Sequence, residues 1–381
     1  MAASLRLPWA RPSGGRPARG LVLEHAEDLR LLKGPWRKGF ALLLLVGYVA
    51  LPGSISEYWV SVLTLCGVYA VGVLGLNLLT GYAGQVSLGH AFFFGAGGYS
   101  AAYFGAQRHW PLPVYLVVAM LIGAAVGAVI GPFALRLRGN YLVIVTLGLV
   151  FVGHHLWHNW DSVTGGGSGT SLRFAPTNLG PLDFRDLEIF GTSYEKEVGL
   201  FWLVWACVAL TALITKNLVR TRPGRAMQAI RDRDLSAEVI GVNLARYKVG
   251  AFAWSSAFAA LSGALYGIVT SRLEVGIFEL TLSITFVAML IIGGGGTIFG
   301  PILGALIVSG GQQVIARNSG ALVFDPVLIS SPGDSGFLSI GEFNNILFGL
   351  GIVLFLLFEP RGVAALWLRF RTWIGAWPFP Y

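Results

Sequence analysis

Long stretches without a single charged side chain constrain the fold of this chain more than any other feature. Asp, Glu, Lys and Arg are all missing from residues 39–56, 58–107, 109–135, 139–160, 198–215, 249–271, 280–316 and 343–358. Charged residues make up only 12% of the 381 residues, whereas about 25% is usual in globular proteins. A soluble fold of this size could not cover its surface with so few charges. The sequence therefore predicts an all-α polytopic membrane protein.

The lengths of these stretches predict the number of spans. A membrane-spanning helix needs about 20 mostly apolar residues. The stretches 58–107 and 280–316 are therefore long enough for two helices each, and the other six hold one each, so about ten transmembrane helices are expected. Glycine-rich sequence at 81–84 and at 293–296 divides the two long stretches.

The basic residues predict the orientation. Of the 27 Lys and Arg residues, 21 fall before the first span, at 136–138, in the loop 216–248 or after the last span. With ten spans these segments share one side, which the positive-inside rule makes cytoplasmic. Both termini are then cytoplasmic, and no cleavable signal peptide is predicted before residue 39. The net charge of +8 is explained by topology, so nucleic acid is not expected as a partner.

Five parts follow from this topology. They are a basic cytoplasmic tail (1–38), a first membrane half (39–156), an extracytoplasmic loop (157–197), a second membrane half (198–360) that includes the cytoplasmic loop 216–248, and a cytoplasmic C-terminal tail (361–381). Five spans per half is an odd number, so the two halves are expected to be inverted repeats with broken or re-entrant segments, as in many transporters. Both glycine-rich interruptions are expected at the entrance to equivalent segments, the third and eighth spans.

A polar run, from Gly81 to His90, is the most informative motif. Polar groups and irregular backbone at membrane depth must be buried in protein or line a cavity. The run therefore indicates either a broken helix beside a translocation path or close helix packing around a hydrogen-bonded histidine. Residues 293–297 allow a second broken segment or a plain cytoplasmic turn. The candidate path residues are Gly84, Gln85, Ser87, Gly89, His90, Gly293, Gly294 and Thr297.

The loop 216–248 is the second informative segment. Pro223-Gly224 marks its start, two short helices are expected around residues 232–234, and Gly241 is expected to end the second helix. Helical patterning with eight bases favours a docking surface for a cytoplasmic partner over a merely solvated loop. The candidate coupling residues are Arg220, Gly224, Arg225, Ala229, Arg231, Asp232, Ala237 and Gly241.

Catalytic chemistry is not predicted for this chain. No Gly-Lys dipeptide is present, so a Walker A phosphate loop is excluded and any ATP must be hydrolysed by another subunit. No catalytic residue, metal ligand or cofactor is assigned. His154, His155 and His158 lie beside tryptophans at a span end, where an interfacial belt explains them. Cys66 and Cys207 lie in apolar stretches and are expected to be free thiols. A membrane-embedded enzyme would need clustered acids or histidines, and an ion-coupled carrier would need a carboxylate buried within a span. The sequence shows neither feature, so both classes are disfavoured.

Residues 76–102 resemble the signature stretch of LivM-type permeases, the membrane subunits of branched-chain amino-acid ABC importers. The likeness recurs at 137–141, at 164–166, through 216–248 and at 293–304, and it covers most of residues 40–360. It implies a permease in the bacterial cytoplasmic (inner) membrane that works by alternating access. It also implies three kinds of protein partner: a second permease subunit, two cytoplasmic ATPase subunits and an extracytoplasmic solute-binding protein. Membrane lipid is expected as a partner from the composition alone. The loop 216–248 is similar to the coupling helices that contact the ATPases.

Two features depart from the family pattern. The basic N-terminal tail has no counterpart in it, and Gly169 is followed by Thr170 where the family has an aliphatic residue. The family also includes relatives for urea and short amides, so the resemblance leaves the solute open. A carrier driven by ions is the less favoured alternative.

Overall fold

The computed structural model describes residues 35–136, 141–166, 169–173, 175–180, 182–189, 192–318, 328–329, 338–359 and 362–376. The chain divides into two units, residues 1–51 and 52–381. Of the first unit, only part of helix α2 (Pro35–Ser54) is described. The predicted tail therefore lies almost entirely outside the described residues.

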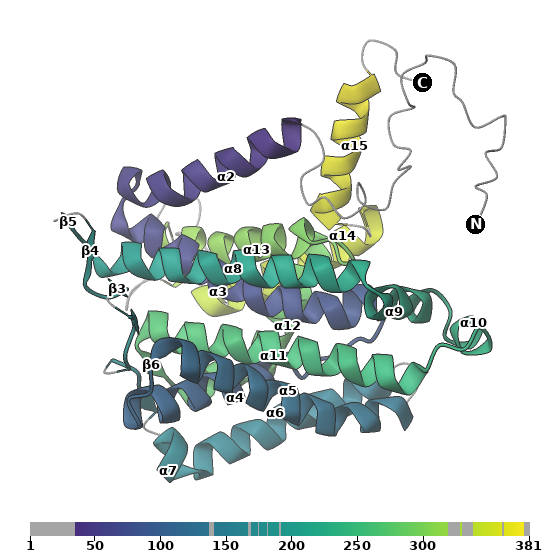
Figure 1. Cartoon of the computed structure of the whole chain (residues 1–381), viewed down its shortest axis with the longest axis horizontal. Coiled ribbons are helices and arrows are strands. Elements are labelled where there is room, and N and C mark those ends of the chain that lie inside the picture. The colour runs from purple at the N-terminus through teal and green to yellow at the C-terminus, as the bar shows by residue number, and fades with distance from the viewer. Residues whose placement is uncertain are drawn as a thin grey trace, which may run out of the picture. The chain divides into compact units, whose positions relative to one another are not determined.

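Helices occupy the predicted apolar segments of the second unit (Figure 1). They are α3 (Glu57–Leu76), α4 (His90–Ala101), α5 (Leu112–Arg136), α6 (Tyr141–Asn159), α8 (Lys196–Arg220), α11 (Leu244–Thr270), α12 (Leu280–Gly293), α13 (Phe299–Arg317) and α14 (Ile340–Phe358). A π-helix, η1 (Asn77–Tyr82), extends α3, and η2 (Ala102–Gln107) extends α4. Among the described residues, six helices are long and apolar enough to cross a membrane. The all-α membrane fold is confirmed, and the count of ten crossings stays a prediction.

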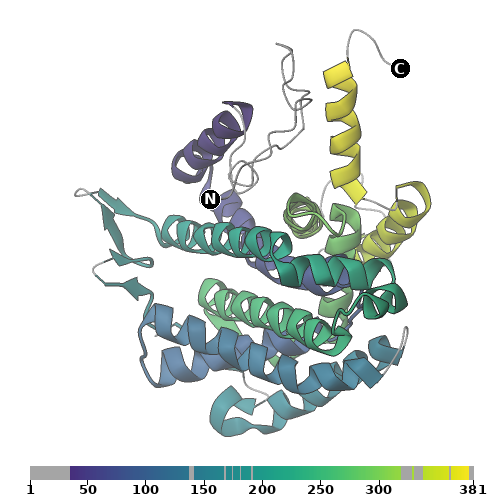
Figure 2. The same ribbon diagram turned by 45° about the vertical axis from the view of Figure 1, so that its right-hand side comes forward.

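Short elements gather at two opposite ends of this helical unit (Figures 1 and 2). One end, here the hairpin end, carries α7 (Asp161–Thr164), the 3-10 helix η4 (Val275–Phe278) and six strands. The strands pair antiparallel as β1 (Thr170–Ser171) with β6 (Arg272–Leu273), β2 (Asn178–Leu179) with β3 (Leu182–Asp183), and β4 (Leu187–Ile189) with β5 (Thr192–Tyr194). The other end, here the α9 end, carries α9 (Arg222–Asp232) and α10 (Asp234–Val239).

Two further segments belong to the C-terminal part. Strands β7 (Leu328–Ile329) and β8 (Leu338–Ser339) form a parallel pair before α14. The predicted C-terminal tail forms a helix, α15 (Gly362–Ala376). Arg369, in the middle of α15, pairs with Glu359 at the end of α14 at 2.6 Å.

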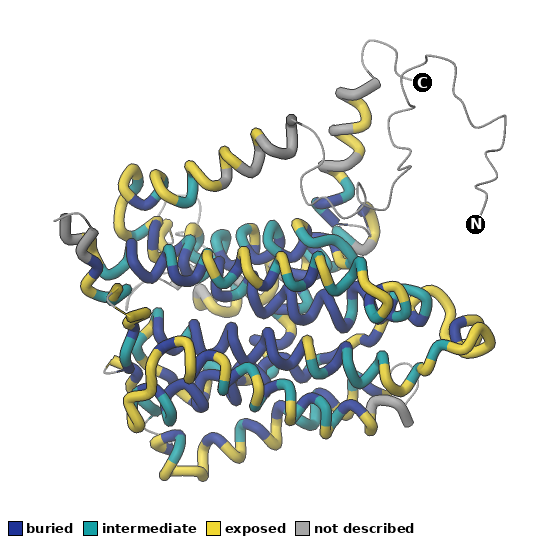
Figure 3. The backbone as a smooth tube through the Cα atoms, viewed as in Figure 1, coloured by how far each residue is buried: buried dark blue, intermediate teal, exposed yellow. Residues whose placement is uncertain are grey.

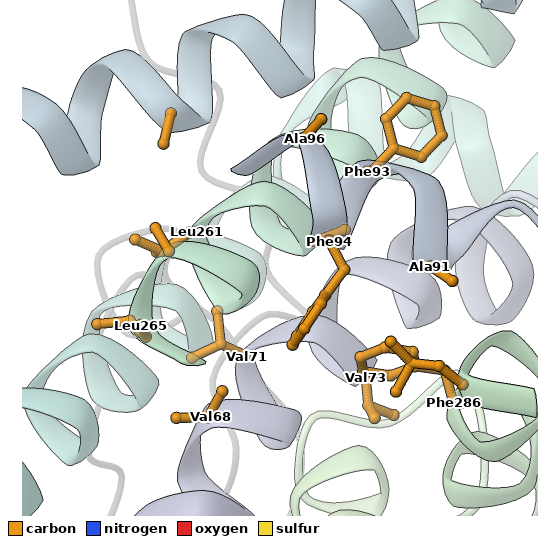
Figure 4. Close-up of a cluster of buried hydrophobic side chains, with 14 of the residues drawn as sticks. Val68, Val71, Val73, Ala91, Phe93, Phe94, Ala96, Leu261, Leu265 and Phe286 are labelled. Carbon is orange, nitrogen blue, oxygen red and sulfur yellow. The ribbon is translucent and has the colours of Figure 1, made fainter. Parts of the chain in front are cut away.

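The core of the second unit lies between α3, α4, α11 and α12. Figure 4 shows their apolar side chains in one cluster, among them Val71, Phe94, Leu261 and Phe286. In Figure 3 α3 and α11 are buried along most of their length, whereas α5 and α6 keep exposed faces. Glycine permits the close approach, because a Cβ atom at Gly97 of α4 would overlap the backbone of Ala260 in α11. The high glycine content thus serves helix packing as well as turns.

The contacts between helices follow a matching pattern. α3 packs on α13 and α12, while α11 packs on α5 and α4; likewise α12 packs on α13 and α14, while α4 packs on α5 and α6. Such pairing is what a two-fold relation between five-helix halves requires, and it supports the predicted inverted repeat.

The predicted equivalence of the two glycine-rich interruptions is wrong in one respect. The first precedes α4, the third helix, but the second follows α12, the eighth, instead of preceding it. α12 is entered through η4 and Glu279 at the hairpin end. Both interruptions therefore lie at the α9 end, where they meet.

Candidate functional site

The first interruption, residues 81–89, is here called the first glycine turn. The backbone leaves the helix as Ala83 N–H donates to Leu78 O at 3.1 Å and Gln85 N–H donates to Leu79 O at 3.0 Å. Gly84 has a φ of +70°, a left-handed conformation that glycine adopts without steric cost. The chain then stays non-helical until α4 begins at His90.

The side chains of this turn point to different surroundings. Gln85 and Ser87 are buried, whereas Val86 is 47% exposed. The Ser87 hydroxyl accepts a hydrogen bond from Gly89 N–H at 3.2 Å. The Oε1 atom of Gln85 is buried with no hydrogen-bond partner among the described residues. This orphaned acceptor is the polar group of the run that remains able to bind something else.

His90 lies in the interior of the protein. Its side chain is 2% exposed, its Nε2 lies 2.9 Å from the carbonyl oxygen of Gly72 in α3, and its ring packs edge-on against Phe286 of α12 at 5.2 Å between ring centres. The next residue is also anchored to α12, because Ala91 N–H donates to the Ser283 hydroxyl at 3.0 Å. His90 thus fixes the start of α4 between α3 and α12.

The second interruption, residues 293–298, is here called the second glycine turn. It contains three of the predicted path residues: Gly293, Gly294 and Thr297. The Thr297 hydroxyl donates to Gly294 O at 3.1 Å and accepts from Gly300 N–H at 3.0 Å. A Cβ atom at Gly293 would overlap the Gly300 carbonyl, so the turn brings α12 and α13 into backbone contact.

Asn77, in the helix that leads into the first glycine turn, bonds to the second one, a contact that the sequence does not predict. Its Nδ2 donates to Thr297 O and its Oδ1 accepts from Gly296 N–H, both at 2.7 Å. The side chain comes from the first residue of η1 and is completely buried. The signal that could have found it is an amide inside a charge-free stretch, since such a group must find partners within the protein.

The loop 216–248 has the predicted local structure. Two short helices, α9 and α10, flank Arg233, and Gly241 follows with a φ of +86°. Of the coupling candidates, Gly224 and Ala237 are buried, Arg220 and Ala229 are partly buried, and Arg225, Arg231, Asp232 and Gly241 are exposed. A Cβ atom at Gly224 would overlap Leu218 O, so α9 is held tightly against the end of α8.

One face of this loop, here called the α9–α10 surface, is both apolar and basic. Leu235, Val239 and Ile240 are 70%, 87% and 74% exposed. Beside them lies an open cavity of about 530 Å³, lined by Arg222, Arg225, Ala226, Ala229, Ile240, Gly241, Val242, Asn243, Arg246 and Tyr247. Three guanidinium groups beside exposed aliphatic side chains suit a partner that is itself partly apolar and partly acidic.

Arg231 connects α9 to the glycine turns. Its Nη1 donates to Gly81 O at 2.5 Å. A Cβ atom at Gly84 would lie 3.2 Å from Arg231 Cα, and one at Gly296 would lie 2.7 Å from Arg231 Nη1. One candidate coupling residue, Arg231, therefore contacts one candidate path residue, Gly84, and reaches both glycine turns at the α9 end.

Comparison with known proteins places the chain in a family. The family model described as "Branched-chain amino acid transport system / permease component" matches residues 58–356. The high-affinity branched-chain amino acid transport system permease protein LivM of Escherichia coli is 30% identical over 344 residues, which cover 86% of this chain and 75% of that protein; LivM of Salmonella typhimurium gives the same values.

A second kind of relative is more distant. The autoinducer 2 import system permease protein LsrC of Salmonella paratyphi B is 25% identical over 285 residues, covering 72% of this chain and 77% of that protein. No solved structure matches. The match to the family model extends over both glycine turns and the α9–α10 surface, and it confirms the resemblance seen in the sequence. This chain belongs to the family of permease components of branched-chain amino acid transport systems.

Proposed function

We propose that this chain is the membrane permease of an ATP-driven importer for branched-chain amino acids. The observation that carries this proposal is the 30% identity to LivM over most of both chains. The likeness to the autoinducer permeases is weaker, at 25% identity, so an apolar amino acid is preferred as solute over other small molecules. The likeness to LivM also favours a location in the bacterial cytoplasmic membrane. Both termini then lie in the cytoplasm, as the basic segments predict.

ATP hydrolysis belongs to partner subunits in this proposal, because the chain has no Gly-Lys dipeptide and hence no Walker A loop. The assembly contains a second permease, two ATPases and a solute-binding protein outside. The α9–α10 surface supports the ATPase contact. Aliphatic side chains exposed to this extent among charged residues are typical of a protein interface.

The solute passage borders the first glycine turn. The buried, unpartnered Oε1 of Gln85 supports a role for this amide as a polar contact on the path. Gly84 and Gly89 give the turn its shape, Ser87 orders it internally, and His90 positions α4. The second glycine turn, with Gly293, Gly294 and Thr297, completes the same region from the other half. Alternating access then requires the two turns to move when the ATPases close.

Uptake into proteoliposomes tests the function. The assembled complex with its binding protein should accumulate labelled leucine, isoleucine or valine when ATP is present on the ATPase side. Urea, acetamide and autoinducer 2 serve as competing solutes. Uptake should stop when the ATPase subunits carry a substitution that prevents hydrolysis. Uptake that continues in an ion gradient with such ATPases would contradict the proposal and favour an ion-coupled carrier.

Substitutions on α10 and at Ile240, which follows it, test the ATPase contact. Burying a leucine or isoleucine side chain contributes about 1.5–3 kcal/mol, so Leu235→Ser and Ile240→Ser should each weaken ATPase retention about tenfold. Ser236→Ala, on the same helix and also exposed, is the matched control and should retain the ATPases. The measurement is the amount of ATPase that copurifies with the tagged permease. Unchanged retention in both serine variants would mean that α10 is not the contact.

A further inference from the structure

We propose that Arg231 is the positioning residue that transmits movement of α9 to both glycine turns. The inference rests on the proposed function, because it assumes that partner subunits move α9. It names the physical link between the α9–α10 surface and the passage.

The first contact is with the end of a central helix. Helices α3 and η1 form a continuous rod from Glu57 to Tyr82. The last carbonyl groups of a helix have no partner within it, and the Gly81 carbonyl is satisfied by Arg231 Nη1 at 2.5 Å. A guanidinium charge also complements the negative end of the helix dipole. Arg231 therefore binds the C-terminal end of the continuous helix formed by α3 and η1.

The second contact is with the turn between α12 and α13. Gly296 has a φ of +78°, and a Cβ atom there would lie 2.7 Å from Arg231 Nη1. A Cβ atom at Gly81 would lie 2.6 Å from Gly296 N. The guanidinium and the two glycine backbones are thus packed together, and Asn77 bridges them from the other side. A displacement of Arg231 must move the two turns as one body.

The third contact involves the stem of the side chain. A Cβ atom at Gly84 would lie 3.2 Å from both Cα and Cγ of Arg231, so the last turn of α9 lies directly on the first glycine turn. Other arginines of the loop make different contacts. Arg225 donates to Arg220 O at 2.9 Å, within the loop, whereas Arg231 donates to Gly81 O in the first glycine turn. Arg233 is exposed like Arg231 and lies between α9 and α10. The geometry therefore distinguishes Arg231 from its basic neighbours.

Reconstituted complex in proteoliposomes tests the proposal. Arg231→Ala should leave complex assembly intact, reduce maximal uptake at least tenfold and reduce ATP hydrolysis less, so that more ATP is used per solute. Arg231→Lys keeps the charge but loses the planar donor fork and should recover part of the uptake. Arg233→Ala is the matched control and should leave the ATP used per solute unchanged. A merely structural role would lower the amount of complex without changing ATP used per solute.

A thiol introduced into the first glycine turn gives a direct readout. Val86 is exposed, so Val86→Cys, in a chain with Cys66 and Cys207 replaced by alanine, can be labelled with a water-soluble maleimide. With Arg231 present, the labelling rate should differ between the ATP-free complex and the ATP-bound complex with non-hydrolysing ATPases. With Arg231→Ala this difference should disappear.

Specific results would overturn the proposal. One is that Arg231→Ala uses the same amount of ATP per solute as the unmodified complex. The other is that labelling of Val86→Cys depends on ATP as strongly with Arg231→Ala as with Arg231. If Arg231→Ala does not assemble, the Arg231→Lys variant is measured instead. More ATP used per solute, together with a smaller ATP-dependent difference in the labelling of Val86→Cys, supports the proposal. Values equal to those of the chain with Arg231 overturn it. Absence of ATP-driven uptake in the unmodified complex would instead refute the proposed function.

Discussion

At the scale of single residues, Asn77 shows how one amide can hold two distant segments. It donates to the carbonyl of Thr297 and accepts from the N–H of Gly296. These residues lie about 220 positions after Asn77 in the chain. Both backbone groups belong to the second glycine turn and are partly buried. A buried amide that bonds both ways gives this junction a defined geometry, because each of its ends accepts only one kind of partner.

Replacing Asn77 by alanine should destabilise the protein. The substitution removes the side-chain partner of the partly buried Gly296 N–H and Thr297 C=O, at up to about 1–3 kcal/mol each. We expect a clearly lower melting temperature of the purified complex. Asn318→Ala is the matched control, since Asn318 bonds only to Val314 O at an exposed helix end, and it should change the melting temperature little. Equal melting temperatures for the two variants would contradict the role given to Asn77.

At the scale of elements, the close contact between helices α4 and α11 depends on glycine. α11 lies against α4 along the core, and a Cβ atom at Gly263 of α11 would overlap the carbonyl oxygen of Phe94. The neighbouring backbone atoms cannot move aside as a flexible side chain could. Because lipid is as apolar as the core, such close packing is a main source of helix association in a membrane.

Two alanine substitutions on α11 test this view. Gly263→Ala should lower the yield of assembled protein severalfold, since it forces α4 and α11 apart. Gly250→Ala lies on the same helix with nothing within 4 Å of the added Cβ, so it should be neutral or stabilise by about 0.5–1 kcal/mol through reduced backbone entropy. Yield after gel filtration and melting temperature are the measurements. Normal assembly of the Gly263 variant would refute the close-packing argument.

At the scale of the whole molecule, central helices connect the two ends of the second unit. The rod formed by α3 and η1 ends at the Arg231 contact. At the hairpin end, pairing of β1 with β6 fastens the predicted extracytoplasmic loop to the connection after α11. Arg185 also orders this loop by donating to the carbonyls of Leu172 at 3.0 Å and Ala175 at 3.2 Å. Both ends are therefore attached to helices that share one core.

The N-terminal tail should be dispensable for transport. The family match begins at residue 58, and the Arg-, Pro- and Gly-rich start cannot bury a core of its own. Deleting residues 1–33 while keeping Arg37 and Lys38 should leave ATP-driven uptake within about twofold, because these two bases still mark the cytoplasmic side. Uptake and the amount of membrane-inserted protein are measured together. Loss of uptake at a normal protein level would reveal a regulatory or assembly role for the tail.

Local signals were enough to predict much of this protein from its sequence. Charge-free stretches marked the positions of the helices, since a membrane span is defined by its own composition. Pro223, Gly224 and Gly241 marked the limits of α9 and α10, because helix breakers act on the backbone nearest to them. The signature at residues 76–102 indicated the family to which the chain belongs. Each of these features is written within a few dozen consecutive residues.

Only the tertiary structure decided how the candidate residues come together. The contact of Arg231 with Gly81 joins positions 150 apart, and Asn77 reaches Gly296 across 219 positions. No local pattern states which turn an arginine or an amide will meet, because those partners depend on how α3, α12 and α13 pack. The same packing placed His90 in the core and left Gln85 Oε1 without a partner. The structure also places the second glycine turn after α12 instead of before it, because α12 begins at the hairpin end and ends at the α9 end.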